Sequence, residues 1–262
     1  MDHIVGLTRA GLLSSVVALC LITIGCSTDD RMRRKATSVE RIKADSRAHS
    51  MIQQLGGISA WKELEVITFD FVVHAGVEVL RRSHVWDKRR GLHRWTEGDI
   101  TAYTDLWSGK GKVFRTEDGQ PSKIEDADDK AAILDEAYRA FINDTWWLAA
   151  PFKVFDEGVH RAVMDGDIRL TFDAGVGLTS GDAYLFHLDD DANLTGWSFD
   201  LESGWSASFM RAERQTVHGV TFHTHHHGPL GFGVRIDQLQ GRQSPAPDIF
   251  GPLSSLRPEL FQ

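Results

Sequence analysis

The segment from Tyr138 to Gly158 reads Tyr-Arg-Ala-Phe-Ile-Asn-Asp-Thr-Trp-Trp-Leu-Ala-Ala-Pro-Phe-Lys-Val-Phe-Asp-Glu-Gly and is the densest aromatic segment of the chain. It belongs to the one long stretch between strand-like runs whose apolar residues recur at helical spacing. The pattern predicts a helix over residues 129–149, and Pro151 is expected to end it. We therefore expect the rest of the chain to fold around this helical insert.

Strand patterns flank the insert on both sides. Apolar and polar residues alternate from Ile67 to His74 with the period of two that is typical of a strand. Before the insert, charged residues 117–129 are expected to form a loop, and further strands are expected at residues 80–87, 92–97, 100–107 and 111–116. After the insert, strands are expected near residues 168–173, 182–189, 194–200, 205–212, 217–226 and 231–239. Short turns join neighbouring strands, which indicates antiparallel pairing.

A helix is also expected before the first strand. Apolar residues recur in a patchy stripe from Val39 to Leu55, and Gly56 and Gly57 end the pattern. A short turn around residues 60–61 follows. The order of elements predicts an α+β fold: a strongly curved antiparallel sheet, a half-barrel of about 11 strands, with the N-terminal helix and the helical insert covering its concave face. A β-sandwich is the alternative, but it offers no natural place for two aromatic helices.

Residues 1–25 are expected to form a signal peptide. Arg9 precedes an apolar run, Leu12–Ile24, that is shorter than the ~20 residues needed to span a bilayer. The segment ending in Cys26 resembles a bacterial lipobox, although Thr23 stands where leucine is usual. Cys26 is therefore expected to be lipidated, for example with palmitate, and two or more acyl chains would hold it at a membrane. An ordinary secretory signal or a short membrane anchor is the alternative.

Composition and charge set further limits. The chain has 262 residues, 42% of them hydrophobic, which is enough to bury a core. Its net charge of −8 argues against a general nucleic-acid binder. Residues 26–37 are expected to form a lipidated tether, residues 38–243 one domain and residues 244–262 a proline-rich tail. Ser27 after the cysteine resembles a signal for release to the outer membrane, so we expect the protein on the periplasmic side of that membrane.

Several motifs resemble those of a known family. They are Leu55-Gly56-Gly57 with Ala60-Trp61, then Asn143-Asp144-Thr145-Trp146-Trp147-Leu148 with Pro151-Phe152-Lys153, and residues 175–182. Over residues 48–240 the chain resembles the LolA/LolB-like superfamily of periplasmic lipoprotein-carrier-like proteins, and uncharacterised bacterial lipoproteins. Members of this superfamily have an unclosed β-barrel whose hydrophobic concave face is covered by helices and holds acyl chains. The motifs are moderately specific for the family and say little about activity.

The resemblance implies an acyl-chain cavity between the insert and the concave face of the sheet. The aromatic residues expected to line or cover this cavity are Phe69, Phe71, Trp86, Trp95, Phe141, Trp146, Trp147, Phe152 and Phe155. The polar residues expected at its mouth are Asn143, Asp144 and Lys153. The alternative is that the aromatic rings simply fill the core, and that the polar residues lie on the helix surface or cap its end.

A histidine run is the main candidate for metal binding. In an alternating strand His223, His225 and His227 share one face. Two of them that are two residues apart could bind one metal ion such as zinc. Zinc needs three or four ligands, and the sequence does not supply the others, so a solvated strand end is the favoured interpretation. The aspartates at residues 126–129 and 189–191 do not have the spacing of a twelve-residue calcium loop.

The sequence contains no nucleophile elbow, no phosphate-binding loop and no zinc-protease helix. We therefore expect a non-enzymatic protein without a cofactor. The aromatic insert and the family resemblance further imply a membrane-anchored lipoprotein that binds a hydrophobic or lipid-like ligand as a carrier, acceptor or sensor. One alternative is a structural or protein-interaction lipoprotein whose half-barrel is filled by its own side chains. Another is a metal-dependent enzyme that uses the histidine run. The sequence does not indicate which proteins would be its partners.

Overall fold

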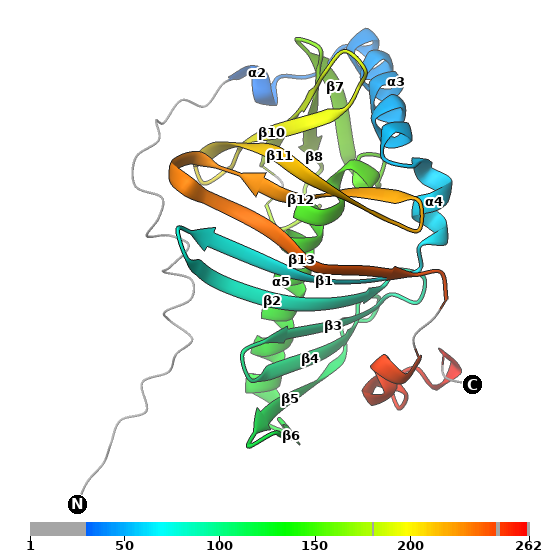
Figure 1. Ribbon diagram of the computed structural model, residues 1–262, viewed down its shortest axis with the longest axis vertical. Coiled ribbons are helices and arrows are strands. Elements are labelled where there is room, and N and C mark those ends of the chain that lie inside the picture. The colour runs from blue at the N-terminus through cyan, green and yellow to red at the C-terminus, as the bar shows by residue number, and fades with distance from the viewer. Residues whose placement is uncertain (1–29, 180, 245–246, 261–262) are drawn as a thin grey trace, which may run out of the picture.

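One large curved sheet dominates the fold. The structure is a computed structural model that describes residues 30–179, 181–244 and 247–260. Its 13 antiparallel strands curve around a long helix, α5 (Ala127–Lys153), as Figure 1 shows. Within the described residues the strand order begins at β6 (Gln120–Lys123) and ends at β7 (Val159–Met164), so the sheet does not close. The expected α+β class and open, curved antiparallel sheet are confirmed.

Two meanders form the sheet. The first runs from β1 (Val66–Ala75) to β6 through β2 (Glu78–Asp87), β3 (Leu92–Glu97), β4 (Ile100–Asp105) and β5 (Gly111–Glu117). The second runs from β7 to β13 (Phe232–Arg242) through β8 (Asp167–Phe172), β9 (Ala183–Leu188), β10 (Leu194–Asp200), β11 (Ser206–Val217) and β12 (Val220–His227). The two meanders meet in the middle of the sheet, where β1 pairs with β13 along its whole length.

Helix α5 connects the two edges of the sheet, from β6 to β7. At 1.5 Å per residue, its 27 residues span roughly 40 Å, which is long enough to cross the strands of the sheet. The side chain of Asp126 caps the first turn by accepting hydrogen bonds from the backbone of residues 128 and 129. The expectation that Pro151 ends the helix was wrong, because the helix continues to Lys153. Pro151 has no N–H to donate to the carbonyl of Trp147, and the burial of Pro151 and Phe152 offsets that loss.

The expected count of about 11 strands was wrong, because two strands were not recognised. Strand β6 lies within residues 117–129, which were expected to form a loop, and all four of its residues are exposed. Strand β7 follows α5 directly and pairs with β8. An exposed edge strand has no buried face, so it lacks the apolar alternation from which the other strands were predicted.

Further helices lie around the sheet. Helix α3 (Ser38–Gln54) begins with a capping box between Thr37 and Glu40, and it packs against β7 and β8. The segment expected to be a short turn around residue 60 is a helix, α4 (Gly57–Glu63). The remaining helical segments are α2 (Asp30–Arg33), η2 (Pro229–Gly231), η3 (Pro247–Leu253) and η4 (Pro258–Leu260). In the C-terminal tail, Phe250 and Leu253 pack into a small core cluster with β1, β2 and β3.

The main core lies between the sheet and the second half of α5. The helix contributes Leu148, Ala149, Ala150 and Phe152 to this core. The largest fully buried rings opposite them come from the strands and include Phe69, Phe186, Trp197, Phe209 and Phe222. Burial of each such ring contributes on the order of 2 kcal/mol or more, so this cluster holds α5 on the sheet.

Gly56 offers a test of the contact between α4 and the β11–β12 turn. It has a φ of 103°, and an added Cβ atom would lie 1.9 Å from the carbonyl oxygen of Gly219. We expect Gly56→Ala to lower the free energy of unfolding by about 3 kcal/mol or more, measured by urea unfolding. Gly76 is the control, because its φ is 76° and no atom lies within 4 Å of an added Cβ. Gly76→Ala should cost only ~1–2 kcal/mol, from backbone strain alone, and equal losses in both variants would contradict the predicted clash.

Candidate functional site

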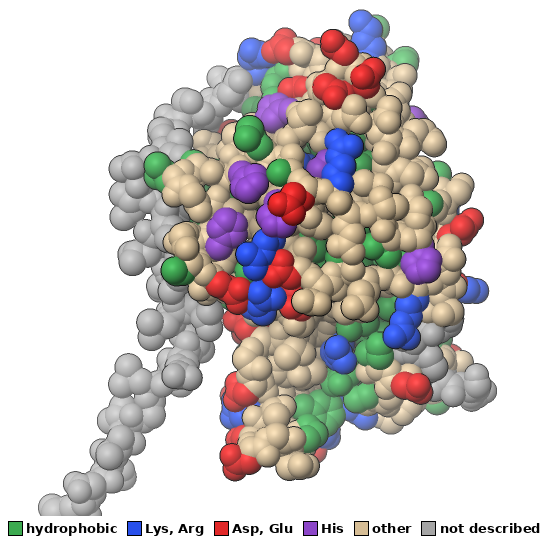
Figure 2. All heavy atoms as spheres, in the orientation of Figure 1, with side chains coloured by type: hydrophobic (Ala, Val, Ile, Leu, Met, Phe, Trp, Pro, Cys, Tyr) green, Lys and Arg blue, Asp and Glu red, His purple; other side chains and the backbone are tan. Residues whose placement is uncertain are grey.

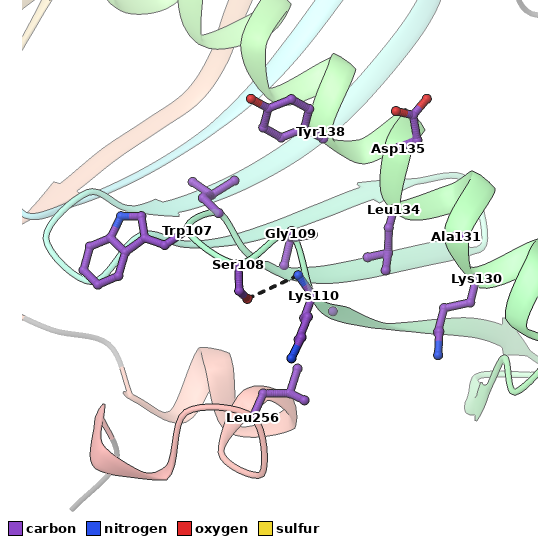
Figure 3. A pocket seen from close by; sticks show the side chains of 13 residues that line it. Trp107, Ser108, Gly109, Lys110, Lys130, Ala131, Leu134, Asp135, Tyr138 and Leu256 are labelled. Atoms are coloured by element: carbon purple, nitrogen blue, oxygen red, sulfur yellow. Dashed lines mark hydrogen bonds between the residues drawn. The ribbon is translucent and has the colours of Figure 1, made fainter.

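A groove of about 800 Å³ opens between the first half of α5, the β4–β5 turn and the C-terminal tail. We call it the Tyr138 groove. Figure 3 shows Tyr138, Leu134 and Trp107 facing it from two sides, with Leu256 of the tail below. Its lining residues are Thr104, Leu106, Trp107, Ser108, Gly109, Lys110, Gly111, Lys130, Ala131, Leu134, Asp135, Tyr138 and Leu256.

The Tyr138 groove combines apolar walls with two amines. Trp107 is 65% exposed and Tyr138 is 44% exposed, although both are large aromatic side chains. The ammonium groups of Lys110 and Lys130 make no ion pair with any residue that the structure describes. The one carboxylate in the lining, Asp135, is already paired with Arg139 at 2.7 Å. The groove therefore exposes apolar surface beside two amines that form no ion pair within the described part of the chain.

Asp105 fixes the turn that carries Trp107. Its carboxylate accepts hydrogen bonds from the backbone N–H of Trp107 at 3.1 Å and from the hydroxyl of Ser108 at 2.8 Å. Arg257 pairs with the same carboxylate at 3.2 Å and lies 4.8 Å from the ring centroid of Trp107. Burial alone would raise the pKa of Asp105, but these hydrogen bonds outweigh it and lower the pKa. Trp107 is therefore held in place by hydrogen bonds within the turn and by Arg257 of the tail.

A second, smaller pocket of about 360 Å³ lies where α4, the end of β2 and the end of α5 meet. We call it the Lys88 pocket. Three of the residues expected to contact a ligand, Trp86, Phe152 and Lys153, line it together with Trp61. The ring of Phe152 stacks on that of Trp61, with centroids 4.7 Å apart.

Asp144, expected at a cavity mouth, is fully buried beneath α5. Its carboxylate lies 2.9 Å from Nε2 of His84 and accepts longer hydrogen bonds of 3.3 Å from Arg82. His84 in turn contacts Nε2 of His93 through its Nδ1 at 3.0 Å. Burial, assisted by the neighbouring His84, lowers the pKa of His93 well below its ordinary value. Asn143 is exposed and donates a hydrogen bond of 2.8 Å to Asp144, so this network anchors the helix to β2 and β3.

Trp146 and Trp147 point into the main core, where both are half-buried. Trp146 contacts Tyr184 at a centroid distance of 5.2 Å, and Trp147 contacts Phe209 at 4.8 Å. Both rings also lie against Trp197. Side chains of the strands therefore occupy the space between this part of α5 and the sheet.

Arg211 and His226 lie next to these tryptophans without polar partners. The guanidinium carbon of Arg211 lies 4.3 Å from the ring centroid of Trp197, and its Nε and Nη2 atoms are buried without a hydrogen bond. Both ring nitrogens of His226 are likewise buried and unpaired. Burial lowers the pKa of Arg211 to about 9. A buried charge without a counter-charge destabilises a fold by several kcal/mol.

The other aromatic residues that were expected at a cavity are spread along the sheet and helix. Phe69 and Phe71 of β1 are buried in the main core, and Phe69 stacks on His84 with centroids 4.7 Å apart. Trp95 lies in a separate cluster with the first half of α5, and Phe141 packs against Trp86 and His93. Phe155 is exposed beyond the end of α5, where it contacts His49 and Arg161. The structure therefore does not bring the nine residues together around one cavity.

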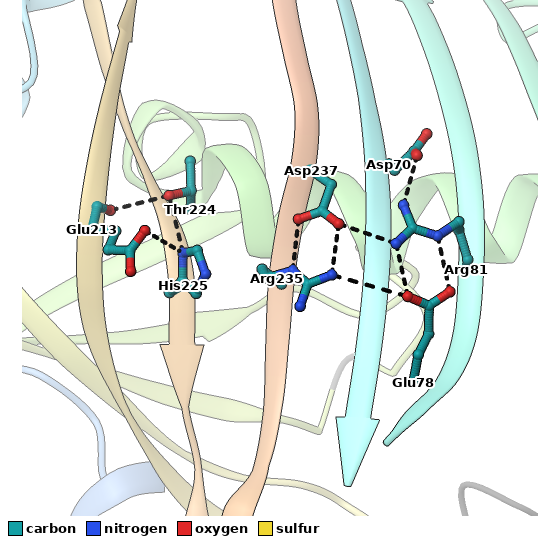
Figure 4. Close-up of polar contacts among 8 residues, drawn as sticks. All are labelled: Asp70, Glu78, Arg81, Glu213, Thr224, His225, Arg235 and Asp237. Carbon is teal, nitrogen blue, oxygen red and sulfur yellow. Dashed lines mark hydrogen bonds and ion pairs between the residues drawn. The ribbon is translucent and has the colours of Figure 1, made fainter. Parts of the chain in front are cut away.

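The outer face of the sheet, turned away from α5, carries charged and histidine side chains. Figure 2 shows histidines gathered over β12 and β13, and Figure 4 shows the ion pairs beside them. Arg81 pairs with Asp70 at 2.8 Å and with Glu78 at 2.7 Å, and Arg235 pairs with Asp237 at 2.7 Å. Pairs of this kind, which remain in contact with water, contribute about 1 kcal/mol or less each, so we assign them no functional role.

The three histidines named as a weak metal candidate differ in their surroundings. His223 is 2% exposed, His225 is half-buried beside Glu213 at 3.2 Å, and His227 is exposed. Within residues 30–179, 181–244 and 247–260, no group of three or more His, Cys, Asp or Glu side chains is arranged to hold a metal ion. Cys26, the predicted lipidation site, lies outside the described residues.

Comparisons with known proteins add no further identification. No protein-family profile matches the chain, and no curated protein matches it in sequence. Among the helices that the structure describes, none is long and apolar enough to cross a membrane.

Sequence reasoning missed the residues of the Tyr138 groove. Tyr138 belongs to the aromatic segment, but Trp107, Lys110, Lys130 and Leu256 come from separate parts of the chain. The one available signal was Trp107, a large aromatic residue at the end of a predicted strand, next to a turn. Such a residue is exposed unless another segment covers it, and exposed aromatic residues mark binding surfaces.

Replacement of Arg211 tests whether its burial is a cost to the fold. We expect Arg211→Met to raise the free energy of unfolding by about 1–3 kcal/mol, because it removes an unpaired charge and keeps the apolar stem. Arg161→Met is the matched control. Arg161 pairs with Asp45 at 2.7 Å and donates to the carbonyl of Val159 at 2.9 Å, so its loss should not stabilise the protein. A clear loss of stability in Arg211→Met, measured by urea unfolding, would contradict this prediction.

The buried histidines predict that acid destabilises the fold. Burial lowers the pKa of His223 to about 3, and it lowers the pKa values of His93 and His226 as well. In the unfolded chain these groups take up protons below about pH 6.5, whereas in the folded protein they stay neutral. Each should therefore remove up to about 1.4 kcal/mol of stability per pH unit as the pH falls from 6.5 toward 4.

Urea unfolding measured from pH 7 to pH 4 checks this prediction. His223→Asn should have a shallower loss of stability than the unchanged protein, because one titrating group is absent. His227→Asn is the control, since His227 is exposed and should leave the slope unchanged. Stability that is constant or rises toward pH 4 would show that these histidines are not held neutral in the fold.

Proposed function

We propose that the protein binds an amphiphilic, lipid-like ligand with an anionic group in the Tyr138 groove, as a carrier, acceptor or sensor. The observation that supports this proposal is the groove itself, with exposed Trp107 and Tyr138 beside unpaired Lys110 and Lys130. Its volume of about 800 Å³ lies within the range of roughly 300–1,000 Å³ that is usual for small-molecule sites.

The chemistry of the groove suits an acyl chain that ends in an anion. Transfer of each methylene group from water to the apolar walls contributes about 0.8 kcal/mol. Lys110 and Lys130 both line the groove, and their side chains point the same way in Figure 3, so an anionic group in the groove would be attracted by both amines. An exposed ion pair contributes only about 0–1 kcal/mol, so the chain would supply most of the affinity and the lysines would select the charge.

The proposed cellular setting follows from the sequence. We propose a signal peptide over residues 1–25, lipidation of Cys26 and a position on the periplasmic side of the bacterial outer membrane. A relationship to the LolA/LolB-like superfamily is part of the same proposal. The open, curved antiparallel sheet supports it, because that is the fold which the resemblance implies. In this setting an anchored protein would receive its ligand from the membrane surface or from a soluble donor.

A structural or protein-interaction role is the second candidate. The observation that favours it is the packing of Trp146 and Trp147 against Trp197 and Phe209. These rings occupy the space between the sheet and the second half of α5. A purely structural role would leave the Tyr138 groove without a ligand. Binding measurements on groove variants therefore separate the two candidates.

Titration of the purified protein with a long-chain fluorescent fatty acid tests the proposal. We expect Trp107→Ala and the double variant Lys110→Met/Lys130→Met each to weaken binding by about tenfold, because they remove a large apolar contact or both charges. Lys123→Met is the control, since Lys123 lies on β6 outside the groove and pairs with Glu125. Neutral and cationic lipids of the same chain length should bind the unchanged protein less tightly than the fatty acid. Undiminished affinity in both groove variants would refute this assignment.

A further inference from the structure

The Lys88 pocket has walls from three separate elements. Trp61 comes from α4, Trp86 from β2 and Phe152 from α5. Trp61 stacks on Phe152 at an interplanar angle of 9°, and the centroid of Trp86 lies 6.0 Å from that of Trp61. These rings fix the shape of the pocket, because each is packed against a ring from another element.

Lys88 extends over these rings. Its Nζ atom lies 3.5 Å from the ring centroid of Trp61, the same ring that stacks on Phe152. It also donates a hydrogen bond to the backbone carbonyl of Trp61. This amine has no carboxylate partner among the residues that the structure describes. A ring face and a carbonyl offer only partial negative charge, so the positive charge of a protonated Lys88 is not balanced.

The other charged groups around the pocket do not balance it either. They are Lys62, Glu65, Arg89, Lys153 and Asp156, and the lining contains no histidine. Both carboxylates are already used, because Arg89 pairs with Glu65 at 2.7 Å and Lys153 pairs with Asp156 at 2.8 Å. The amines of Lys62 and Lys88 are therefore left in excess, in a protein whose net charge is −8.

The burial of Lys88 has a measurable electrostatic consequence. Desolvation lowers the pKa of this amine to about 7, so roughly half of the molecules carry an uncharged Lys88 at neutral pH. An anion beside Nζ would stabilise the protonated form and raise the pKa again. A ligand that brings a negative charge is thus favoured over a neutral ligand of the same shape.

We infer that the Lys88 pocket binds a small organic carboxylate, whose apolar part contacts Trp86 and Phe152 and whose carboxylate pairs with Lys88 and Lys62. A volume of about 360 Å³ holds about a dozen non-hydrogen atoms, if each occupies about as much space as a water molecule, roughly 30 Å³. This site is separate from the Tyr138 groove and shares no lining residue with it.

Isothermal titration of the full-length protein with octanoate at pH 6 and at pH 8 tests the inference. Octanoate is ionised at both values, whereas the protonated fraction of free Lys88 falls about tenfold between them. We expect octanoate to bind about tenfold more weakly at pH 8 than at pH 6. Lys88→Arg should bind octanoate without this pH dependence, because arginine stays charged. Lys88→Met should lose at least tenfold in affinity at pH 6.

Matched controls distinguish this site from the groove and from nonspecific apolar binding. Octanol, with the same tail and no charge, should bind at least tenfold more weakly than octanoate at pH 6 and show no pH dependence. Lys62→Met should weaken octanoate binding by a smaller factor than Lys88→Met. The double variant Lys110→Met/Lys130→Met, which alters only the Tyr138 groove, should leave octanoate binding at the Lys88 pocket unchanged. If the Tyr138 groove proves not to bind a long-chain fatty acid, the assignment of a carboxylate to the Lys88 pocket is therefore unaffected.

Three results would overturn the inference. The first is octanoate affinity that is the same at pH 6 and pH 8 in the unchanged protein. The second is undiminished pH 6 affinity in both Lys88→Met and Lys62→Met. The third is a loss of octanoate binding in the Lys110→Met/Lys130→Met variant, which would place octanoate in the Tyr138 groove instead.

Discussion

The structure depends on one connection, helix α5, which joins opposite edges of an open sheet. A chain that leaves the sheet at β6 and re-enters it at β7 must cross the other strands, and a helix does so while pairing its own backbone groups. Buried Asp144 holds the helix to His84 and Arg82, and the aromatic cluster holds its second half. The first half extends beyond the main core, and the Tyr138 groove opens beside it.

Much of the fold could be predicted from periodicity. The strands β3 and β10 have the predicted bounds, and β1 differs by one or two residues, because each has a buried face that imposes alternation. Strand β6 was missed because all of its residues are exposed. The end of α5 was misplaced because Pro151 was taken as a terminator. Pro151 removes only its own hydrogen bond, to the carbonyl of Trp147, and the burial of Phe152 favours continuation of the helix.

The candidate sites were much harder to predict than the fold. Aromatic residues near Trp146 were expected to meet a ligand, yet the sequence does not indicate how fully the facing strands fill the space beneath them. The Tyr138 groove requires a turn, a helix and the tail to come together across about 150 residues of sequence, which local patterns do not report. Three lining residues of the Lys88 pocket, Trp86, Phe152 and Lys153, were predicted from the sequence to contact a ligand. Lys88 itself was not predicted, because a lysine in a predicted turn is ordinarily a solvated residue.

The central pairing of β1 with β13 also bears on how the chain reaches its fold. These strands stand at opposite ends of the domain sequence, so their contacts have a very large sequence separation, and loop closure of this kind slows folding. Each meander can assemble from local hairpins, but β1 remains an unpaired apolar edge until the last strand arrives. Such an edge is a template for aggregation, so the chain is most exposed to misassembly in the interval before β13 pairs with β1.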